Sequence, residues 1–406
     1  MNNLHWKRDF TILCLGQAVS ILTSSVLQMA LIWHLTATTK SALALSIASL
    51  AGFLPNAVLG LVAGVMVDRI NRKTAMIGAD LFIAAVSLAL VFASIQGKLP
   101  MGLILAVLAI RSIGTAFHTP AISATTPLLV PADSLTKCAG YTQSMQTIGY
   151  IAGTAIAGVL YPIWSISGMV ALDVIGAVFA CCCVAILKIP AIQRQTKTTS
   201  ASSGLLIEMK EGYAALHHEK GLLALLWTAA VFMILYSPIN ALFPLMSLAY
   251  FGGTTAQASI AEIAFSAGML LGGFVLGIWG GFQKNRLGIP LSVAMMGVPI
   301  GLSGLLPPSG FWGFALLCIV MGLSVPFYNG PVTALMQKKI APEYLGRVFG
   351  LYGSVASIAM PIGLMLSGAF ADQIGIHHWF LLSGILCVLL AVFMYWIPAI
   401  RKIDQP

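Results

Sequence analysis

The chain has 406 residues, of which 59% are hydrophobic and only 8% are charged. Soluble domains carry roughly 25% charged residues, so this composition excludes an ordinary soluble protein and indicates a membrane protein. The formal net charge of +9 could suggest binding to nucleic acid. The positions of the basic residues, described below, argue against that partner.

Twelve apolar runs follow one another, and each approaches or exceeds the ~20 residues that a helix needs to cross a bilayer. They predict an all-α membrane protein, because an open sheet cannot satisfy its backbone hydrogen bonds in lipid. The first run is too long for a signal peptide and lacks a small-residue cleavage pattern. The predicted helices cover residues 11–34, 42–67, 74–95, 101–126, 138–163, 168–187, 222–247, 257–279, 287–306, 311–336, 346–370 and 378–398.

The longest polar stretch lies near the middle of the chain and predicts a boundary between two domains. We expect an N-terminal six-helix bundle over residues 1–187 and a cytoplasmic linker over 188–221. A C-terminal six-helix bundle should cover residues 222–406. No sizeable soluble domain is predicted, which disfavours a membrane receptor or an accessory subunit of a larger complex.

The basic residues are distributed unevenly between the two sides of the membrane. If both termini and every even-to-odd helix junction are cytoplasmic, those segments hold all but three of the 21 Lys and Arg residues. The exceptions are Lys40, Lys98 and Arg111, and the last of these lies inside the predicted fourth helix. This asymmetry follows the positive-inside rule, so it predicts cytoplasmic termini and accounts for the net charge without nucleic acid.

Proline pairs indicate that the chain is duplicated. Pro120 and Pro131 are eleven residues apart, as are Pro331 and Pro342, and the second pair follows the first at an offset of 211 residues. Two pseudo-symmetric six-helix halves are typical of secondary transporters, whose binding site lies between the halves. A shorter repeat, glycine followed four residues later by Asp or Gly, lies at the ends of three predicted helices. Its copies are Gly64-x-x-x-Asp68, Gly277-x-x-x-Gly281 and Gly368-x-x-x-Asp372.

Four charged residues fall inside predicted helices: Asp80, Arg111, Asp173 and Glu262. Each costs about 2.5–3.5 kcal/mol near a helix centre, so none should face lipid. Arg111 is interpreted as a proton-relay or substrate-cavity residue, with a structural hydrogen-bonding hub as the alternative. Glu262 is interpreted as a protonatable or cation-binding acid, with a group that reaches the outer interface as the alternative.

The two aspartates leave more than one interpretation open. Asp173 is a candidate for proton coupling or for the substrate cavity, and helix-to-helix packing is its alternative role. Asp80 is a candidate of the same kind, but it lies near the inner end of its helix. Pairing with Arg69, Arg72 or Lys73 at the inner surface is the simpler explanation of Asp80.

Histidine and cysteine give weaker signals. His34 and His118 lie in predicted helices and are interpreted as packing residues. The seven cysteines also fall within predicted helices, which argues against a disulfide framework. The run from Cys181 to Cys183 could be a palmitoylation site, but packing is the favoured interpretation.

The sequence contains no metal-ligand spacing, nucleophile–base pair, phosphate loop or nucleotide-binding motif. We therefore expect no cofactor, no bound metal and no enzymatic activity. A transporter without a nucleotide-binding motif must draw on an ion gradient for uphill export.

The loop between the second and third predicted helices, Gly64-x-x-x-Asp68-Arg69-x-x-Arg72-Lys73, resembles the signature loop of the major facilitator superfamily. Asn71 stands where that signature usually has glycine. In the family, the acidic position contacts the start of helix 11 and locks the outward-facing state. The resemblance therefore implies that Asp68, Arg69 and their loop form a gate.

Two further stretches resemble motifs of the same superfamily. Arg111-Ser-Ile-Gly114 is similar to its helix 4 arginine motif, with the glycine one residue early. Gly149-x-x-x-Gly153-Thr-x-x-Ala157-Gly158 is similar to its helix 5 antiporter motif, and this resemblance makes Gly149, Gly153 and Gly158 gating candidates. Thr154 replaces the usual proline of that motif and Ala157 replaces one glycine, so passive uniport stays an alternative to antiport.

Longer blocks resemble the Mef-type macrolide efflux proteins within this superfamily. They include Arg111-Ser-Ile-Gly-Thr-Ala-Phe-His-Thr-Pro-Ala121, Pro238-Ile-Asn-Ala-Leu-Phe-Pro244 and Glu343-Tyr-Leu-Gly-Arg-Val-Phe349. The resemblance implies export of macrolide antibiotics or similar amphipathic cationic drugs in exchange for protons. The location would be the bacterial cytoplasmic membrane, and we expect a monomer. Export of another drug class, or of a metabolite such as a siderophore, is the alternative.

Overall fold

The computed structural model describes residues 6–95, 99–131, 135–187, 213–214, 216–217, 219–282, 284–340 and 342–404. Within these ranges the regular secondary structure is helical, and no strand is found among them. Eleven helices of the described chain are long and apolar enough to cross a membrane. The prediction of an all-α membrane fold is confirmed.

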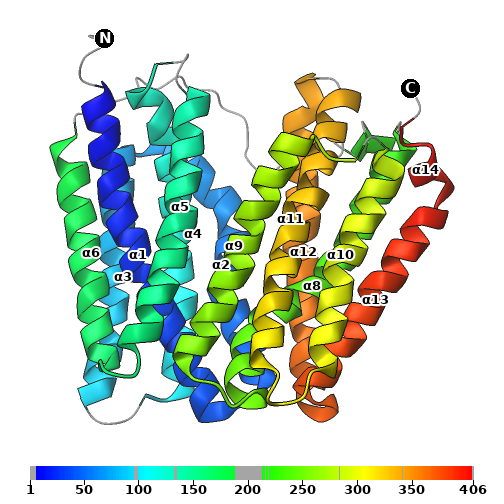
Figure 1. Ribbon diagram of the computed structural model, residues 1–406. Helices are drawn as coiled ribbons and strands as arrows, with labels where there is room; N and C mark the ends of the chain where they lie inside the picture. Colours follow the sequence, from blue (N-terminus) through cyan, green and yellow to red (C-terminus); the bar gives the residue numbers. More distant parts are fainter. Residues whose placement is uncertain are drawn as a thin grey trace. The chain divides into compact units, whose positions relative to one another are not determined.

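The first six helices are followed, after residues outside the described ranges, by a second series (Figure 1). The first series is α1 (Trp6–Thr39), α2 (Ala42–Arg69), α3 (Arg72–Ile95), α4 (Met101–Leu129), α5 (Leu135–Leu160) and α6 (Ile166–Ile186). The second series is α8 (Lys220–Leu245), continued by the π-helical turn η2 (Met246–Tyr250), then α9 (Thr255–Trp279), α10 (Asn285–Leu305), α11 (Phe311–Lys339), α12 (Pro342–Ile374), α13 (Ile376–Trp396) and the short α14 (Pro398–Arg401).

The helices form two compact units. One unit comprises Met1–Thr38 and Ala48–Thr198, and the other comprises Thr39–Ile47 and Thr199–Pro406. The chain passes from one unit to the other within the predicted linker, at Thr198. One segment departs from the predicted division, because the start of α2 packs with the second unit.

Each unit repeats the same helix pairing. In the first unit α3 packs against α6, and in the second α10 packs against α13, which are again the third and sixth long helices of their series. The helices that carry the repeated prolines, α4 and α11, are both 29 residues long. This agreement in length and pairing supports the duplication read from the proline spacing.

Small residues allow the helices of the second unit to approach closely. A Cβ atom built on Gly268 of α9 would lie 2.1 Å from the Ile319 carbonyl oxygen of α11. On the other side of this contact, a Cβ on Gly322 would lie 1.9 Å from the Phe265 carbonyl oxygen. Backbone therefore meets backbone between α9 and α11, and no larger residue fits at either position.

Acidic side chains cap two helices of the second unit. Asp372, near the end of α12, accepts hydrogen bonds from the backbone N–H groups of Ala42 and Leu43 at 2.5 and 3.1 Å. Asp404 accepts hydrogen bonds at 3.0 Å from the backbone N–H groups of Asn285 and Arg286, which begin α10. Both carboxylates lie at helix N-termini, where unpaired N–H groups and the helix dipole favour negative charge.

The departure from the superfamily signature at position 71 has a structural reason. Asn71 lies between α2 and α3, and its Oδ1 atom accepts a hydrogen bond from the Lys73 backbone N–H at 2.9 Å. Asparagine thus supplies the N-terminal cap that glycine could not provide. The Lys73 ammonium group donates to the backbone carbonyl oxygens of Ala185 and Leu187, where α6 ends.

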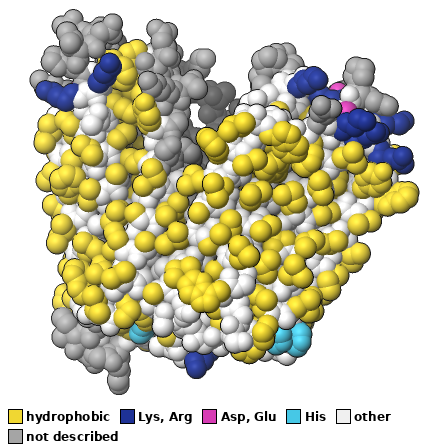
Figure 2. Space-filling model, in the orientation of Figure 1, with side chains coloured by type: hydrophobic (Ala, Val, Ile, Leu, Met, Phe, Trp, Pro, Cys, Tyr) yellow, Lys and Arg dark blue, Asp and Glu magenta, His cyan; other side chains and the backbone are white. Residues whose placement is uncertain are grey.

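The surface of the second unit is that of a membrane protein. Figure 2 shows hydrophobic side chains over the flanks of its helices, with Lys and Arg gathered at the end that carries α14. Exposed apolar residues on these flanks include Phe274, Ile278, Leu316 and Phe393. Such a continuous apolar flank needs lipid to cover it.

We expect Gly268→Ala to destabilise the second unit, because the added methyl group has no space against the α11 backbone. Overpacking of this kind costs about 1–3 kcal/mol. Thermal unfolding of the purified variant in detergent should show a lower midpoint than that of the unsubstituted protein. Gly277→Ala is the matched control on the same helix, since nothing lies within 4 Å of its Cβ position. Equal midpoints for the two variants would contradict the proposed backbone contact.

Candidate functional site

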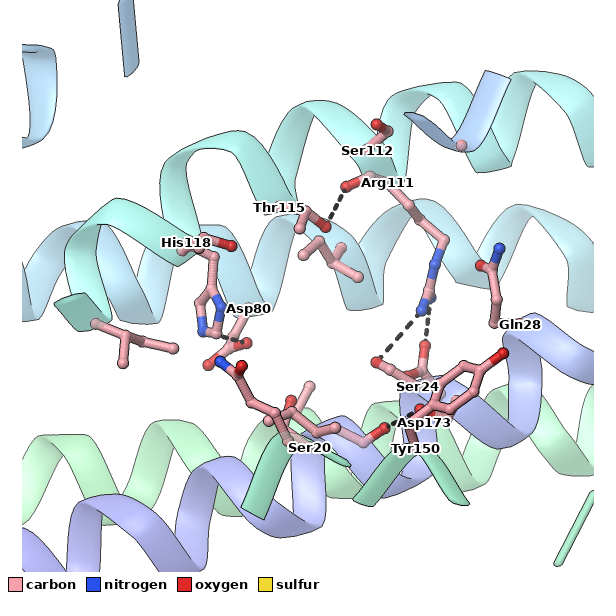
Figure 3. A pocket seen from close by; sticks show the side chains of 18 of the residues that line it. Ser20, Ser24, Gln28, Asp80, Arg111, Ser112, Thr115, His118, Tyr150 and Asp173 are labelled. Atoms are coloured by element: carbon pink, nitrogen blue, oxygen red, sulfur yellow. Dashed lines mark hydrogen bonds and ion pairs between the residues drawn. The ribbon is translucent and has the colours of Figure 1, made fainter. Parts of the chain in front are cut away.

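The first unit contains a cavity of about 790 Å³ lined by residues from all six of its helices (Figure 3). One face of α4 supplies much of the wall, since its lining residues recur at helical spacing. They are Leu108, Arg111, Ser112, Thr115, His118, Thr119, Ile122 and Thr126. The cavity therefore follows α4 along more than half of that helix.

Two other helices contribute polar stripes that were not predicted from the sequence. The α1 stripe contains Ser20, Ser24 and Gln28, and the α5 stripe contains Thr142, Gln146 and Tyr150. In both stripes the residues are four apart, so they lie on one helix face. A search of the apolar helices for polar residues at this spacing would have found them.

Arg111 and Asp173 form a buried ion pair at the wall of the cavity. The Arg111 guanidinium donates to the Asp173 carboxylate, to the Ser87 hydroxyl and, at 3.3 Å, to the Ser24 hydroxyl. The Ser24 hydroxyl in turn donates to the carboxylate at 2.7 Å, whereas the single Ser87 hydroxyl hydrogen has two acceptors, the carboxylate at 3.2 Å and the Ile83 carbonyl oxygen at 2.9 Å. The four side chains come from α4, α6, α1 and α3, so one closed network joins four helices.

This network satisfies its charges internally. Asp173 is 2% exposed and Arg111 is 7% exposed, yet each has its opposite charge and two hydroxyl partners. Buried charges persist in a membrane only with such partners. The structure brings together two of the sequence candidates, Arg111 and Asp173, as a positive and a negative group that leave the network formally neutral.

Asp80 and His118 form a second polar pair in the same cavity. The His118 Nε2 atom lies 3.1 Å from Asp80 Oδ1, and Figure 3 shows the imidazole directed at the carboxylate. Asp80 is only 4% exposed, and its Oδ2 atom has no hydrogen-bond partner among the described residues. The His118 ring thus faces a buried carboxylate at the cavity wall, a contact that its interpretation as a packing residue did not include.

The Asp80–His118 pair and the Arg111 network lie on the same faces of α3 and α4, two helical turns apart. Asp80 precedes Ser87 by seven residues on α3, and His118 follows Arg111 by seven residues on α4. Seven residues are two helical turns, which correspond to about 10 Å along either axis. The Asp80–His118 pair thus lies two turns from the Arg111 network, toward the end of α4 that leads to α5. Asp80 therefore lies in the cavity wall beside His118.

Glu262 lies in the second unit, on α9, and is 7% exposed. Its charge interacts with the Tyr236 hydroxyl of α8 and with the Cys318 thiol of α11. Glu262 has no salt-bridge partner among the described residues. It is therefore a buried acid of the kind that was expected, with no cation to neutralise it.

The α5 glycines predicted to take part in gating lie against α1. A Cβ atom on Gly149 would lie 2.9 Å from the Ile21 side chain, and one on Gly153 would lie 2.7 Å from the Leu22 carbonyl oxygen. Gly158 is buried farther along the same helix. These glycines let α5 approach α1 next to the cavity-lining residue Ser25.

The remaining gating candidates belong to the signature loop. Gly64 and the side chains of Asp68 and Arg69 lie outside the described residues. Arg72 is the first residue of α3. Among the residues that the structure describes, no three His, Cys, Asp or Glu side chains come together in a way that could hold a metal ion.

The family model of the Major Facilitator Superfamily matches residues 13–360 and 225–405 of the chain. The chain belongs to this superfamily. The protein is accordingly a multi-pass membrane transporter, and the resemblance read from the signature loop is confirmed.

Curated relatives and solved structures agree with this assignment. Macrolide efflux protein A of Streptococcus pyogenes is 54% identical to the chain, and the match covers 98% of each protein. The multidrug efflux pump Tap of Mycolicibacterium fortuitum is 29% identical over 92% of this chain and 91% of that protein. A bacterial homologue of the human lysosomal transporter Spinster shares the fold, with a TM-score of 0.72 and 14% identity over 99% of this chain and 98% of its own.

The buried ion pair predicts strong coupling between its two members. Asp173→Asn leaves an unpaired guanidinium in the first unit and should destabilise it by about 3–5 kcal/mol. The double variant Arg111→Gln with Asp173→Asn removes both charges, so it should be more stable than Asp173→Asn alone. A double-mutant cycle of thermal unfolding in detergent measures this coupling. Additive effects of the two substitutions would show that the charges do not depend on each other.

Proposed function

We propose that the protein exports macrolide antibiotics from bacteria in exchange for protons, by alternating access. The observation that carries this proposal is the 54% identity to Macrolide efflux protein A over nearly the full length of both chains. A match of that extent includes the helices that line the cavity as well as those that build the scaffold. It therefore favours a shared substrate class in addition to a shared fold.

The cavity of the first unit suits a drug of this kind. Its volume of about 790 Å³ is within the range of roughly 300–1,000 Å³ that is usual for drug-sized ligands. Apolar side chains such as Ile21, Ile83 and Leu108 can pack against the lactone ring, while serine and threonine hydroxyls can bind its oxygen atoms. Macrolides carry one protonated amine, for which an anionic partner is needed.

Glu262 is the proposed proton-binding acid of the second unit. It is buried there and has no salt bridge among the described residues, so a bound proton would remove an unfavourable charge. Binding and release of a proton at this carboxylate would couple drug export to proton entry. The Arg111–Asp173 network, already neutral, would set the electrostatic environment of the cavity in the other unit.

The remaining parts of the proposal concern the setting of the transporter. We place it as a monomer in the bacterial cytoplasmic membrane with both termini in the cytoplasm, because the basic loops follow the positive-inside rule. Asp68, Arg69 and the rest of the segment from Gly64 to Arg72, where α2 ends and α3 begins, would form the cytoplasmic gate. The close contact of Gly149 and Gly153 with α1 would let the helices next to the cavity shift against one another.

A broader drug range is the second candidate. It is favoured by the 29% identity to the multidrug efflux pump Tap over most of both chains. Hydroxyl groups spaced along a cavity accept many oxygen-rich ligands, so another drug class or a secreted metabolite such as a siderophore could also bind. These candidates share the transport cycle and differ only in the substrate.

Expression in a drug-sensitive bacterial host tests the proposed function. Cells that produce the protein should accumulate less labelled macrolide than vector controls, because the proton gradient drives the drug out. A protonophore should restore the accumulation to the control level. Accumulation equal to the vector control before the protonophore is added would exclude macrolide export.

Glu262→Gln should abolish proton-driven export while the protein stays in the membrane. Glutamine keeps the size of the side chain but can neither bind a proton at pH 7 nor attract a cation. The measurement is macrolide accumulation in energised cells, with membrane content of the protein quantified in parallel. Ser259→Ala, one turn earlier on α9, is the control for substitution of a buried residue in this helix. Uphill export at the unsubstituted rate would remove Glu262 from the mechanism.

A further inference from the structure

We propose that Asp80 and His118 form a second proton-binding site in the first unit, at which a proton and the cationic amine of the drug replace each other. This inference rests on the proposed function and extends it to a pair of residues that the transport cycle above does not use. The argument begins with the difference between the two polar pairs in the cavity wall.

The Arg111 network is hydrogen-bonded on every side. Both carboxylate oxygens of Asp173 already accept hydrogen bonds, and the guanidinium keeps its proton in proteins. By contrast, the Asp80–His118 pair is incomplete. Asp80 Oδ2 is buried and has no hydrogen-bond partner within the described part of the chain, although the carboxylate lines a cavity.

The charge of the pair depends on one proton. With neutral imidazole the pair carries one negative charge, and with protonated imidazole it is neutral. Histidine is the side chain that makes this exchange in the physiological pH range. A protonated amine of the drug would therefore be attracted to the unprotonated pair, and protonation of His118 would weaken its binding. One cation leaves the site for each proton that enters it.

The surroundings of the pair contain few other titratable groups. Arg111, Asp173 and Tyr150 line the same cavity, and Arg111 and Asp173 neutralise each other. The neutral Cys181 thiol of α6 lies near the Asp80 carboxylate. Among the described residues that line the cavity, the basic side chains are Arg111 and His118, and His118 is the one that contacts Asp80.

The position of the pair also suits the exchange. It lies in the wall of the cavity, two helical turns from the Arg111 network, so a bound drug could place its amine at the pair and its ring beside the network. The Asp80 Oδ2 atom and the drug amine would complete the hydrogen bonding that the pair lacks. The ligand chemistry of this site is thus a monovalent organic ammonium ion.

The test measures equilibrium binding of a labelled macrolide to the purified protein in detergent between pH 7.5 and pH 5.5. The unsubstituted protein should bind more weakly as the pH falls. The double variant Asp80→Asn with His118→Gln should bind the macrolide more weakly at pH 7.5, because one ionic attraction is gone. Its affinity should fall about tenfold less between pH 7.5 and pH 5.5 than the affinity of the unsubstituted protein. Ser112→Ala, a change at another cavity residue that has no charge, should leave the pH profile intact.

A second variant keeps the proposal testable if the double variant does not fold. His118→Gln retains the carboxylate, so the drug still binds, but fewer protons should be released per bound drug in weakly buffered solution at pH 6.5. A pH profile and a proton release equal to those of the unsubstituted protein would overturn this inference alone. Failure of the unsubstituted protein to bind any macrolide would instead overturn the proposed function, and this inference with it.

Discussion

The ion pair between Arg111 and Asp173 is the interaction on which the arrangement of the first unit depends. A single charge near the centre of a membrane helix costs about 2.5–3.5 kcal/mol, so neither side chain is tolerated without the other. Because the pair also needs the hydroxyls of Ser24 and Ser87, four helices must meet at one place. The cavity forms beside this meeting point, since a polar cluster keeps the helices from closing into a purely apolar core.

Two buried acids lie outside that network. Asp80 faces His118 in the first unit, and Glu262 in the second unit has no salt-bridge partner among the described residues. Their incomplete pairing is unfavourable for stability, which argues that it serves transport. The glycine contacts instead stabilise the helix packing, because they let helix backbones approach closely, as between Gly268 and Ile319.

Hydropathy alone predicted the helices and their order, because the length of an apolar run is set by the thickness of the bilayer. It could not predict helix ends, since α1 and α12 continue as polar helix beyond their apolar runs. Arg111 and Asp173 were found as rare charges within apolar runs. The contact between His118 and Asp80 was not predicted, because the two residues are 38 positions apart and only helix packing brings them together. The caps by Asn71 and Asp404 likewise depend on local geometry and on distant contacts.

The central claim is that a proton gradient alone drives this protein to move a macrolide. Liposomes that contain only the purified protein, with a pH difference imposed across the membrane, test it most directly. Labelled macrolide should accumulate in the more acidic compartment, and collapse of the pH difference should release it. Accumulation above that of protein-free liposomes is required, because a weak base also distributes passively. Equal accumulation with and without the protein would contradict the account.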